Sequence, residues 1–221
     1  MFTPFRFEPK FLIAWLRNPR QIGAIWPSGS ELTHAMAAQI QHPPGVIVEL
    51  GAGTGAVTSA LLSRGVSDQQ LVVVEKDPLL AAELSRRFPG VRIVLGDAAR
   101  LSKLLGEIHV GPVDQIVSSL PLLSLRRQTR LRILSQIVRN LTPRGRLIQF
   151  SYSPKSPIST GLSESLQMEG SIRQRVLWNF PPARVWVYTR RGEPGTLCRF
   201  SGSVLADRSD DPHHSALRDP R

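Results

Sequence analysis

The distribution of hydrophobic and polar residues changes along the chain, and its middle is the most regular part. From residue 45 onward, short runs of apolar, mostly β-branched residues alternate with longer stretches in which apolar residues recur every three or four positions. The first pattern is typical of strands buried on both faces, and the second of amphipathic helices. Strands are expected at 46–50, 71–75, 91–95, 113–117 and 146–152, and helices at 57–65, 78–88 and 125–141. This alternation predicts an α/β fold with a doubly wound, mostly parallel sheet.

Two further strands are expected near the end of the regular region. Residues 172–179 and 184–189 are extended runs joined through Phe180-Pro181-Pro182, with no helix between them. Consecutive strands without a crossover helix pair antiparallel. We therefore expect an antiparallel edge to a sheet of seven strands.

Local end signals predict where several elements begin. Ser28 and Glu31 have the spacing of a capping box and predict a helix that runs to about Ile40. Ser124 is the expected N-cap of the helix that follows the fourth strand. Pro143-Arg144-Gly145 predicts a turn before the fifth strand.

The first twenty residues have a pattern of their own. Phe7, Phe11 and Trp15 recur every four positions, and basic residues such as Lys10 fall on other faces of the same expected helix. A basic amphipathic helix with aromatic residues suits a membrane headgroup interface. A helix that packs on the rest of the protein would show the same periodicity, so both interpretations stay open at this point.

Length and composition set the domain organisation. The chain has 221 residues, of which 41% are hydrophobic, enough for one α/β domain with a sizeable core. We expect an N-terminal amphipathic helix at 1–24, one domain at 25–191 and a disordered tail at 192–221.

Charge adds a statement about partners. The formal net charge is +11, and residues 120–191 alone carry +11, whereas 1–20 carry +3, 21–119 carry −2 and 192–221 carry −1. All but four of the 28 cations are arginines, the residue type suited to bidentate phosphate contacts. The excess predicts an anionic partner, either nucleic acid or an acidic membrane surface.

Several classes of protein are disfavoured. The single cysteine, Cys198, allows neither an internal disulfide nor a cysteine-based zinc cluster. No apolar stretch approaches the roughly 18–20 residues that span a bilayer, and the first residues lack the apolar run of a signal peptide. We expect a cytoplasmic protein, or one bound peripherally to a membrane.

The strongest chemical signal is a glycine-rich turn after the first strand, Glu49-x-Gly51-x-Gly53-x-Gly55. Glycines in such a turn let backbone N–H groups approach a ligand. The spacing departs from the G-x-G-x-x-G of dinucleotide-binding proteins, and the Gly-Lys-Ser/Thr ending of a P-loop is missing, so a pyrophosphate site is disfavoured.

These motifs resemble the class I methyltransferases that use S-adenosylmethionine, across roughly residues 25–190. In that family the E-x-G-x-G-x-G turn binds the cofactor, an acidic residue closing the second strand binds the ribose hydroxyls, and an acidic residue followed by a small one lies beside the adenine. The resemblance implies a Rossmann-like sheet, S-adenosylmethionine as cofactor and no metal. It assigns cofactor binding to Glu49, Gly51, Ala52, Gly53, Gly55, Glu75, Lys76, Asp97, Ala98 and Ser118.

The acceptor motif at the fourth strand departs from that of the enzymes that methylate adenine amines in ribosomal RNA. Those enzymes carry N-L-P-F/Y, in which the aromatic residue stacks on the base. Here Ser119 replaces the asparagine and Leu122 the aromatic residue, while the Leu-Pro turn is kept. Base stacking is worth about 1–3 kcal/mol, so its loss disfavours a nucleobase and favours a lipid or other flexible amine. The residues expected beside the acceptor amine are Ser118, Ser119, Leu120, Pro121 and Tyr152.

A more specific resemblance is to the bacterial phospholipid N-methyltransferases. It rests on residues 23–28, the E-L-G-A-G-T-G turn, Ser-Ser-Leu-Pro-Leu-Leu at 118–123, and Gln149-Phe150-Ser151-Tyr152, where family members commonly have threonine in place of Ser151. The resemblance implies methylation of phosphatidylethanolamine and its partly methylated forms towards phosphatidylcholine. It also implies peripheral attachment to the cytoplasmic face of an anionic membrane. The residues expected to contact lipid are Phe7, Lys10, Phe11, Trp15, Trp26, Arg126, Arg127 and Arg130.

Two alternatives remain open. The first is an RNA adenine-N6 methyltransferase of the ribosomal RNA dimethylase type, which the charge and the Leu-Pro turn support, although nucleic acid is the less expected partner. The second is a non-catalytic protein that binds lipid surfaces. The general base is not identified, and His34 and His109 are candidates by residue type alone.

Overall fold

A computed structural model describes residues 28–177 and 182–192. The expected N-terminal helix and nearly all of the expected tail lie outside these ranges. The helices are α2 (Ser28–Ala37), α3 (Ala56–Ser63), α4 (Pro78–Arg87), α5 (Leu101–Glu107), α6 (Arg127–Asn140) and α7 (Thr160–Ser165). The strands are β1 (Ile47–Leu50), β2 (Leu71–Glu75), β3 (Arg92–Leu95), β4 (Val113–Ser118), β5 (Leu141–Ser151), β6 (Met168–Val176) and β7 (Ala183–Arg190).

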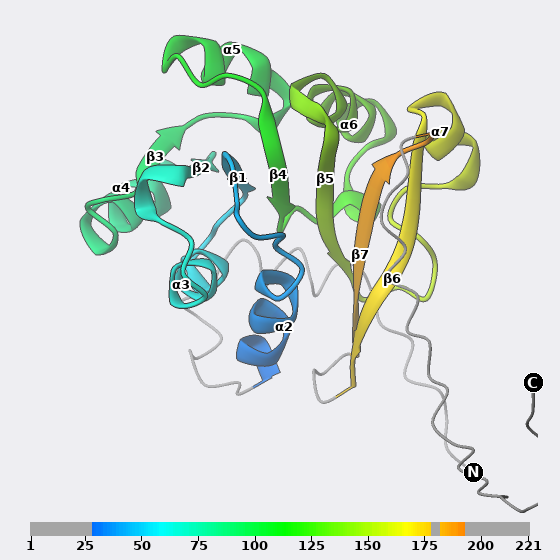
Figure 1. Cartoon of the computed structure of the whole chain (residues 1–221), viewed down its shortest axis with the longest axis horizontal. Coiled ribbons are helices and arrows are strands. Elements are labelled where there is room, and N and C mark those ends of the chain that lie inside the picture. Colours follow the sequence, from blue (N-terminus) through cyan, green and yellow to red (C-terminus); the bar gives the residue numbers. More distant parts are fainter. Residues whose placement is uncertain (1–27, 178–181, 193–221) are drawn as a thin grey trace, which may run out of the picture.

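The strands form one seven-stranded sheet in the order β3-β2-β1-β4-β5-β7-β6 (Figure 1). Strands β1 to β5 pair parallel, and β7 pairs antiparallel with both β5 and β6. The expected doubly wound, mostly parallel sheet with an antiparallel edge is therefore confirmed. Because β7 lies between them, β5 and β6 run in the same direction.

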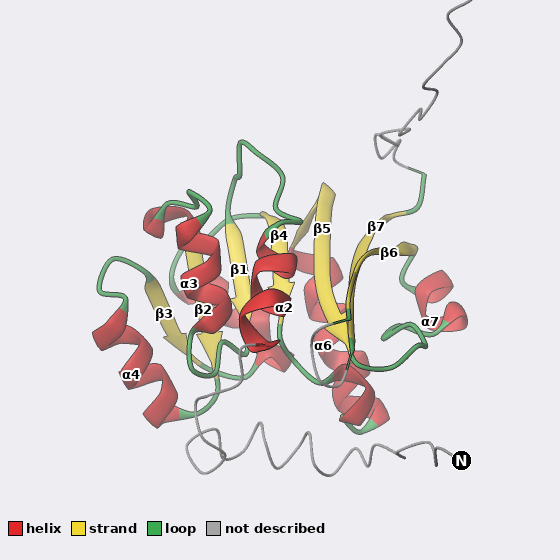
Figure 2. Cartoon of the chain, turned by 90° about the horizontal axis from the view of Figure 1, so that it is seen from below, coloured by secondary structure: helices red, strands yellow, loops and turns green. Residues whose placement is uncertain are grey.

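Helices cover both faces of the sheet (Figure 2). Residues of α2, α3 and α4 pack into one apolar cluster, and residues of α5, α6 and α7 pack into the other. The central strands are buried on both sides, as their continuous apolar runs predicted. Among the described ranges, no helix has the length and hydropathy needed to cross a bilayer.

The structure corrects several predicted boundaries. Helix α6 begins at Arg127, and Ser124 lies in the preceding 3₁₀ turn, so Ser124 is not its N-cap; Arg126 holds that position without a side-chain cap. The short helices α5 and α7 went unpredicted because six or seven residues hold too few turns to show a helical period.

The expected turn at Pro143-Arg144-Gly145 is instead part of β5. The parallel ladder with β4 shifts register there, from Leu141 paired with Val113 to Arg146 paired with Gln115. Proline has no N–H group and cannot donate a hydrogen bond to a neighbouring strand. It is tolerated here because the pairing is already interrupted. The turn residues thus mark a local break in pairing and not the start of the strand.

Gly170 makes room for the largest fully buried side chain of the sheet. It pairs with Tyr188, and a Cβ atom at residue 170 would lie 2.1 Å from the Tyr188 ring. Tyr188 is 1% exposed, stacks on Trp186 and exchanges a 2.7 Å hydrogen bond with Ser156. The packing of Tyr188 at the antiparallel edge therefore requires glycine at position 170, which the alternation of apolar and polar residues in the strand does not predict.

We expect Gly170→Ala to lower the free energy of unfolding by about 1–3 kcal/mol, because the methyl group must displace the Tyr188 ring. Ser171→Ala, on the same strand at an exposed position, is the matched control and should change it by less than about 0.5 kcal/mol. Urea unfolding followed by circular dichroism measures both. Equal stabilities for the two variants would show that the ring is free to move.

Candidate active site

The turn after β1 brings backbone N–H groups to the carboxyl edge of the sheet. Gly51 and Gly53 have φ of 72° and 55°, in the left-handed region that favours glycine. A Cβ atom at Gly51 would lie 2.6 Å from the Leu120 side chain, whereas one at Gly53 would meet nothing within 4 Å. The turn therefore packs tightly against the loop after β4 on one side and is open on the other.

Glu75, the last residue of β2, holds this turn in place. Its Oε2 accepts a hydrogen bond of 2.9 Å from the Gly53 N–H, and its Oε1 accepts from the N–H groups of Lys76 and Asp77 at 2.8 and 3.0 Å. Glu75 is 7% exposed. The carboxylate that the sequence assigned to ribose binding thus also fixes the geometry of the glycine turn.

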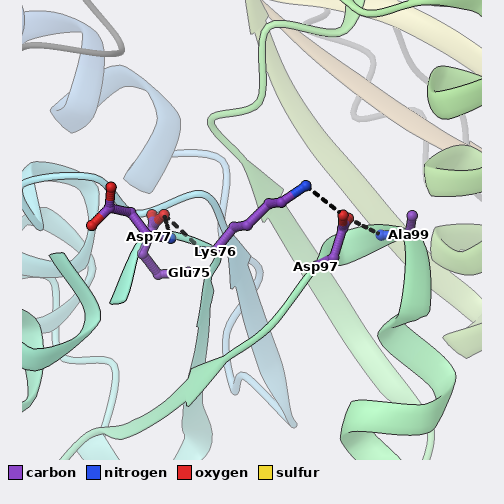
Figure 3. Close-up of polar contacts among 5 residues, drawn as sticks. All are labelled: Glu75, Lys76, Asp77, Asp97 and Ala99. Atoms are coloured by element: carbon purple, nitrogen blue, oxygen red, sulfur yellow. Dashed lines mark hydrogen bonds and ion pairs between the residues drawn. The ribbon is translucent and has the colours of Figure 1, made fainter. Parts of the chain in front are cut away.

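A second carboxylate is held at the end of β3 (Figure 3). Asp97 Oδ1 accepts from the Ala99 N–H at 2.9 Å, and Oδ2 receives the Lys76 Nζ at 2.7 Å. Burial opposes ionisation of Asp97, but these contacts and the charge of Arg100 outweigh it and hold the pKa of Asp97 below its usual value. Lys76, predicted to contact cofactor, therefore orients Asp97 in this structure.

Glu49 lies in the middle of the sheet and is fully buried. Its Oε2 accepts a 2.7 Å hydrogen bond from the Thr58 hydroxyl of α3, while its Oε1 is buried without a partner. Burial, helped by the nearby charge of Glu75, raises the pKa of Glu49 from 4.5 to about 7, and the Thr58 hydrogen bond opposes that rise. Thr58 was missed by sequence reasoning because a hydroxyl one turn into a helix carries no signal of its own.

The loop after β4 forms a tight turn beside the glycine turn. Ser119 donates its N–H to the Leu50 carbonyl at 2.9 Å, and its hydroxyl oxygen is buried without a partner. The Leu122 N–H donates to the Leu120 carbonyl at 2.9 Å. Leu122, which stands where the RNA enzymes have an aromatic residue, is 2% exposed and packs in the core, whereas Leu123 is 43% exposed.

Gln149 of β5 completes this loop. Its Nε2 donates to the carbonyls of Leu120 and Phe150 at 3.0 and 2.9 Å, and its Oε1 is buried without a partner. The sequence placed Gln149 in a family motif but gave it no role; a polar residue inside a buried strand was the available signal.

The other predicted residues are placed as follows. Tyr152 packs edge-to-face on Phe150 with 5.3 Å between ring centroids. Arg126 and Arg127 are exposed at the start of α6, and Arg130 is half-buried with its Nε unpartnered. Ala52 and Ala98 are buried in the two loops, and Ser118 is fully buried at the end of β4. The predicted lipid contacts Phe7, Lys10, Phe11, Trp15 and Trp26 lie outside the described residues.

The two histidine candidates are not brought to the acceptor turn. His109 follows α5 and precedes β4, so it lies at the amino edge of the sheet, opposite to the site. His34 lies on α2, in a surface depression that it shares with Arg64 and Arg175. Neither position supports a role as general base for the acceptor amine.

The residues at the carboxyl edge fit the implied cofactor. Glu49 Oε1, Ser119 Oγ and Gln149 Oε1 are buried without partners, and they come from β1, the end of β4 and β5, which are neighbours in the sheet. Carboxylate and amide oxygens only accept hydrogen bonds, so this set suits ligands that carry N–H groups or positive charge. S-adenosylmethionine carries both, and an amine acceptor carries the first.

Comparisons with known proteins show what the chain is similar to. Residues 47–145 match the family described as a methyltransferase domain. An ornithine lipid N-methyltransferase of Singulisphaera acidiphila is 29% identical over 148 residues, which are 65% of this chain and 77% of the relative. A ribosomal RNA small subunit methyltransferase A of Kineococcus radiotolerans is 32% identical over 200 residues, or 80% of this chain, which span 63% of the relative.

Solved structures show the same fold. Magnesium protoporphyrin IX methyltransferase from Synechocystis PCC 6803, with bound S-adenosylmethionine, aligns with a TM-score of 0.62 at 13% identity, over 85% of this chain and all of that one. A Burkholderia thailandensis 1,6-didemethyltoxoflavin-N1-methyltransferase with S-adenosylhomocysteine aligns at 0.58 and 18% identity, over 82% and 86% of the two chains.

The raised pKa of Glu49 predicts a specific pH dependence. The native state holds a proton that the unfolded chain releases above about pH 4.5, so the stability contributed by this group falls as the pH rises from 4.5 to 7 and is constant above. Glu49→Gln should lack this fall. The difference in free energy of unfolding between the wild type and Glu49→Gln should therefore change by about 3 kcal/mol between pH 4.5 and pH 7. Urea unfolding at a series of pH values measures it.

Thr58→Val is the informative companion variant. It removes the hydrogen bond that lowers the pKa of Glu49, so the fall in stability should extend to higher pH than in the wild type. Parallel pH profiles for all three proteins would mean that Glu49 ionises in the folded state as it does in water, contrary to this account.

The family match, the fold and the geometry lead to one assignment. Glu49, Glu75 and Asp97 stand at the carboxyl ends of three parallel strands, where such sheets bind their ligands, and the glycine turn between them leaves an open approach. Residues 47–145 match a methyltransferase domain, and the described residues have the fold of the class I methyltransferases.

Proposed function

We propose that the protein transfers methyl groups from S-adenosylmethionine to the amine of phosphatidylethanolamine and its partly methylated forms, towards phosphatidylcholine. We place this activity at the cytoplasmic face of an anionic membrane. The observation that carries the proposal is the aliphatic character of the acceptor turn at the end of β4.

This turn offers no group that stacks on a base. Leu122 occupies the position of the stacking aromatic residue but is buried in the core, and the side chain exposed at the turn is Leu123. An aromatic platform contributes about 1–3 kcal/mol per base in single-strand recognition, and a leucine does not replace it. A flexible amine on an acyl lipid needs apolar surroundings and hydrogen-bond acceptors, which this turn has.

The similarity to an ornithine lipid N-methyltransferase supports a lipid amine as acceptor, because it extends over 77% of that protein. Two independent observations therefore support a lipid amine, the similarity to this relative and the geometry of the turn. Phosphatidylethanolamine is preferred within that class on the resemblance of residues 118–123 and 149–152 to the phospholipid N-methyltransferases.

The chemistry asked of the chain is positioning and deprotonation. Bound cofactor supplies an electrophilic methyl group, so the residues need only hold the acceptor nitrogen in line and exclude water. A free alkylamine has a pKa near 10, and burial among apolar side chains lowers it, so that the acceptor loses its proton to solvent before the methyl transfer. We assign Ser119 and Gln149, whose unpartnered oxygens lie at this turn, to the orientation of the acceptor amine.

The basic residues next to the turn suit a phosphodiester. Arg126 and Arg127 are exposed at the start of α6, three and four residues after Leu123. Guanidinium groups bind phosphate bidentately. We assign these two arginines to the lipid phosphate or to neighbouring anionic headgroups.

A ribosomal RNA adenine methyltransferase is the second candidate. The 32% identity to a ribosomal RNA methyltransferase over 200 residues favours it, and so does the positive charge of residues 120–191. The buried Leu122 and the serine at position 119 argue against it, since both recognition groups of the N-L-P-F/Y motif are replaced.

We expect label from radioactive S-adenosylmethionine to enter the lipid phase when the full chain is incubated with phosphatidylethanolamine vesicles, and not to enter total RNA. Glu75→Ala serves as the control, because loss of the carboxylate frees the glycine turn. It should weaken cofactor binding about tenfold or more, the effect of losing a charge-assisted hydrogen bond. Label in RNA alone would overturn the proposed acceptor, and label in neither phase would favour a non-catalytic lipid binder.

The N-terminal segment gives a separate test of the membrane. Deletion of residues 1–20 should weaken co-sedimentation with anionic vesicles, because it removes Phe7, Phe11, Trp15 and a net charge of +3. The full chain with Lys10→Gln is a milder variant that should show an intermediate loss. Unchanged sedimentation of the truncated protein would indicate that this segment only packs on the domain.

A further inference from the structure

Four large apolar side chains are exposed among the described residues, and all four lie at the same edge of the sheet. Leu79 is the second residue of α4, Leu95 ends β3, Leu123 lies in the 3₁₀ turn (Leu122–Ser124) after β4, and Leu177 follows β6. Their exposures are 72%, 56%, 43% and 71%. Since β6 runs in the direction of β5, all four lie at the edge where the parallel strands end. We call this set the leucine rim.

The leucine rim extends across the sheet. Its members lie at or just after the ends of β3, β2, β4 and β6, which include both edge strands of the order β3-β2-β1-β4-β5-β7-β6. This is the edge that holds the glycine turn and the acceptor turn, and it is the lower side of the sheet in Figure 2, where β1 to β5 end. In the part of the chain that the structure describes, no large apolar side chain of comparable exposure lies at the opposite edge.

Basic side chains accompany the leucine rim. Lys76, whose side chain is 76% exposed although its Nζ is paired with Asp97, precedes Leu79 by three residues, and Arg175 precedes Leu177 by two. Arg126 and Arg127 follow Leu123. Exposed leucines interspersed with lysine and arginine match the chemistry of an anionic bilayer interface, where apolar groups enter the acyl boundary and cations meet the headgroups.

We propose that the leucine rim is a membrane-docking surface that sets the carboxyl edge of the sheet face-down on an anionic phospholipid bilayer. The proposal rests on the proposed function in that the bilayer is where a lipid acceptor resides. It goes beyond that function because it fixes the orientation of the domain and does not depend on residues 1–20. In this orientation an acceptor amine reaches the Ser119 turn from the headgroup layer without leaving the membrane.

The test uses vesicles of phosphatidylglycerol and phosphatidylcholine, which lack a primary amine, so that binding is measured apart from turnover. Leu79→Ser with Leu177→Ser, both away from the acceptor turn, should bind these vesicles about tenfold more weakly than the wild type. Leu79→Trp with Leu177→Trp should bind at least as tightly as the wild type, a result that damage to the fold would not produce. Thermal unfolding of each variant checks that stability is retained.

A matched variant places the same aromatic group at the other edge of the sheet. Gln69 is exposed in the 3₁₀ turn (Asp68–Gln70) that precedes β2, so Gln69→Trp should leave vesicle binding unchanged. Serine variants of the leucine rim that bind as tightly as the wild type would overturn the proposal, and so would equal gains from tryptophan at both edges.

The outcomes also separate this inference from the proposed function. Methyl transfer to detergent-dispersed phosphatidylethanolamine, together with vesicle binding that is insensitive to the leucine rim, would overturn the docking surface and leave the activity in place. Loss of vesicle binding in the serine variants, together with label only in RNA, would support the docking surface and overturn the acceptor.

Discussion

The buried carboxyl group of Glu49 is the constraint around which the site is arranged. It lies on the interior strand β1, accepts a hydrogen bond from Thr58, and has a second oxygen without a partner. Burial makes the ionised form of this carboxyl group unfavourable unless a further hydrogen-bond donor or a positive charge lies beside it. The pKa of Glu49 therefore rises to about 7. The free protein therefore holds a group whose charged form suits a cationic ligand such as the cofactor.

The other polar groups of the candidate site lie near Glu49, at the edge of the sheet where the parallel strands end. The Glu75 carboxylate accepts hydrogen bonds from backbone N–H groups, one of them in the glycine turn, and Lys76 forms an ion pair with Asp97. These contacts fix the positions of the Glu75 and Asp97 carboxylates. The acceptor turn is tied to β1 and β5 through Ser119 and Gln149. The glycine turn and the acceptor turn thus lie side by side where β1 and β4 pair, at the same edge of the sheet as the leucine rim.

Much of this could be predicted from the sequence because each signal was local. The β-branched runs predicted the five parallel strands, and Glu49, Glu75 and Asp97 lie at or near the ends of three of them, as expected. What could not be predicted depended on contacts between distant residues. Thr58 and Gln149 gain their roles only when α3 and β5 pack beside the glycine and acceptor turns, and Gly170 is explained only by the ring of Tyr188 on the neighbouring strand. Leu122 was assigned by motif position, yet the fold buries it and exposes Leu123 instead.

We infer that Glu49 is partly protonated near neutral pH in the free protein and ionises when a cationic cofactor binds, and calorimetry tests this directly. Titration of the wild type with S-adenosylmethionine at pH 6.5, in buffers of different ionisation enthalpy, counts the protons exchanged on binding. The account predicts release of a substantial fraction of one proton per cofactor bound, a release that vanishes at pH 9 and in Glu49→Gln. Binding with no proton release at pH 6.5, or with the same release in Glu49→Gln, would contradict it.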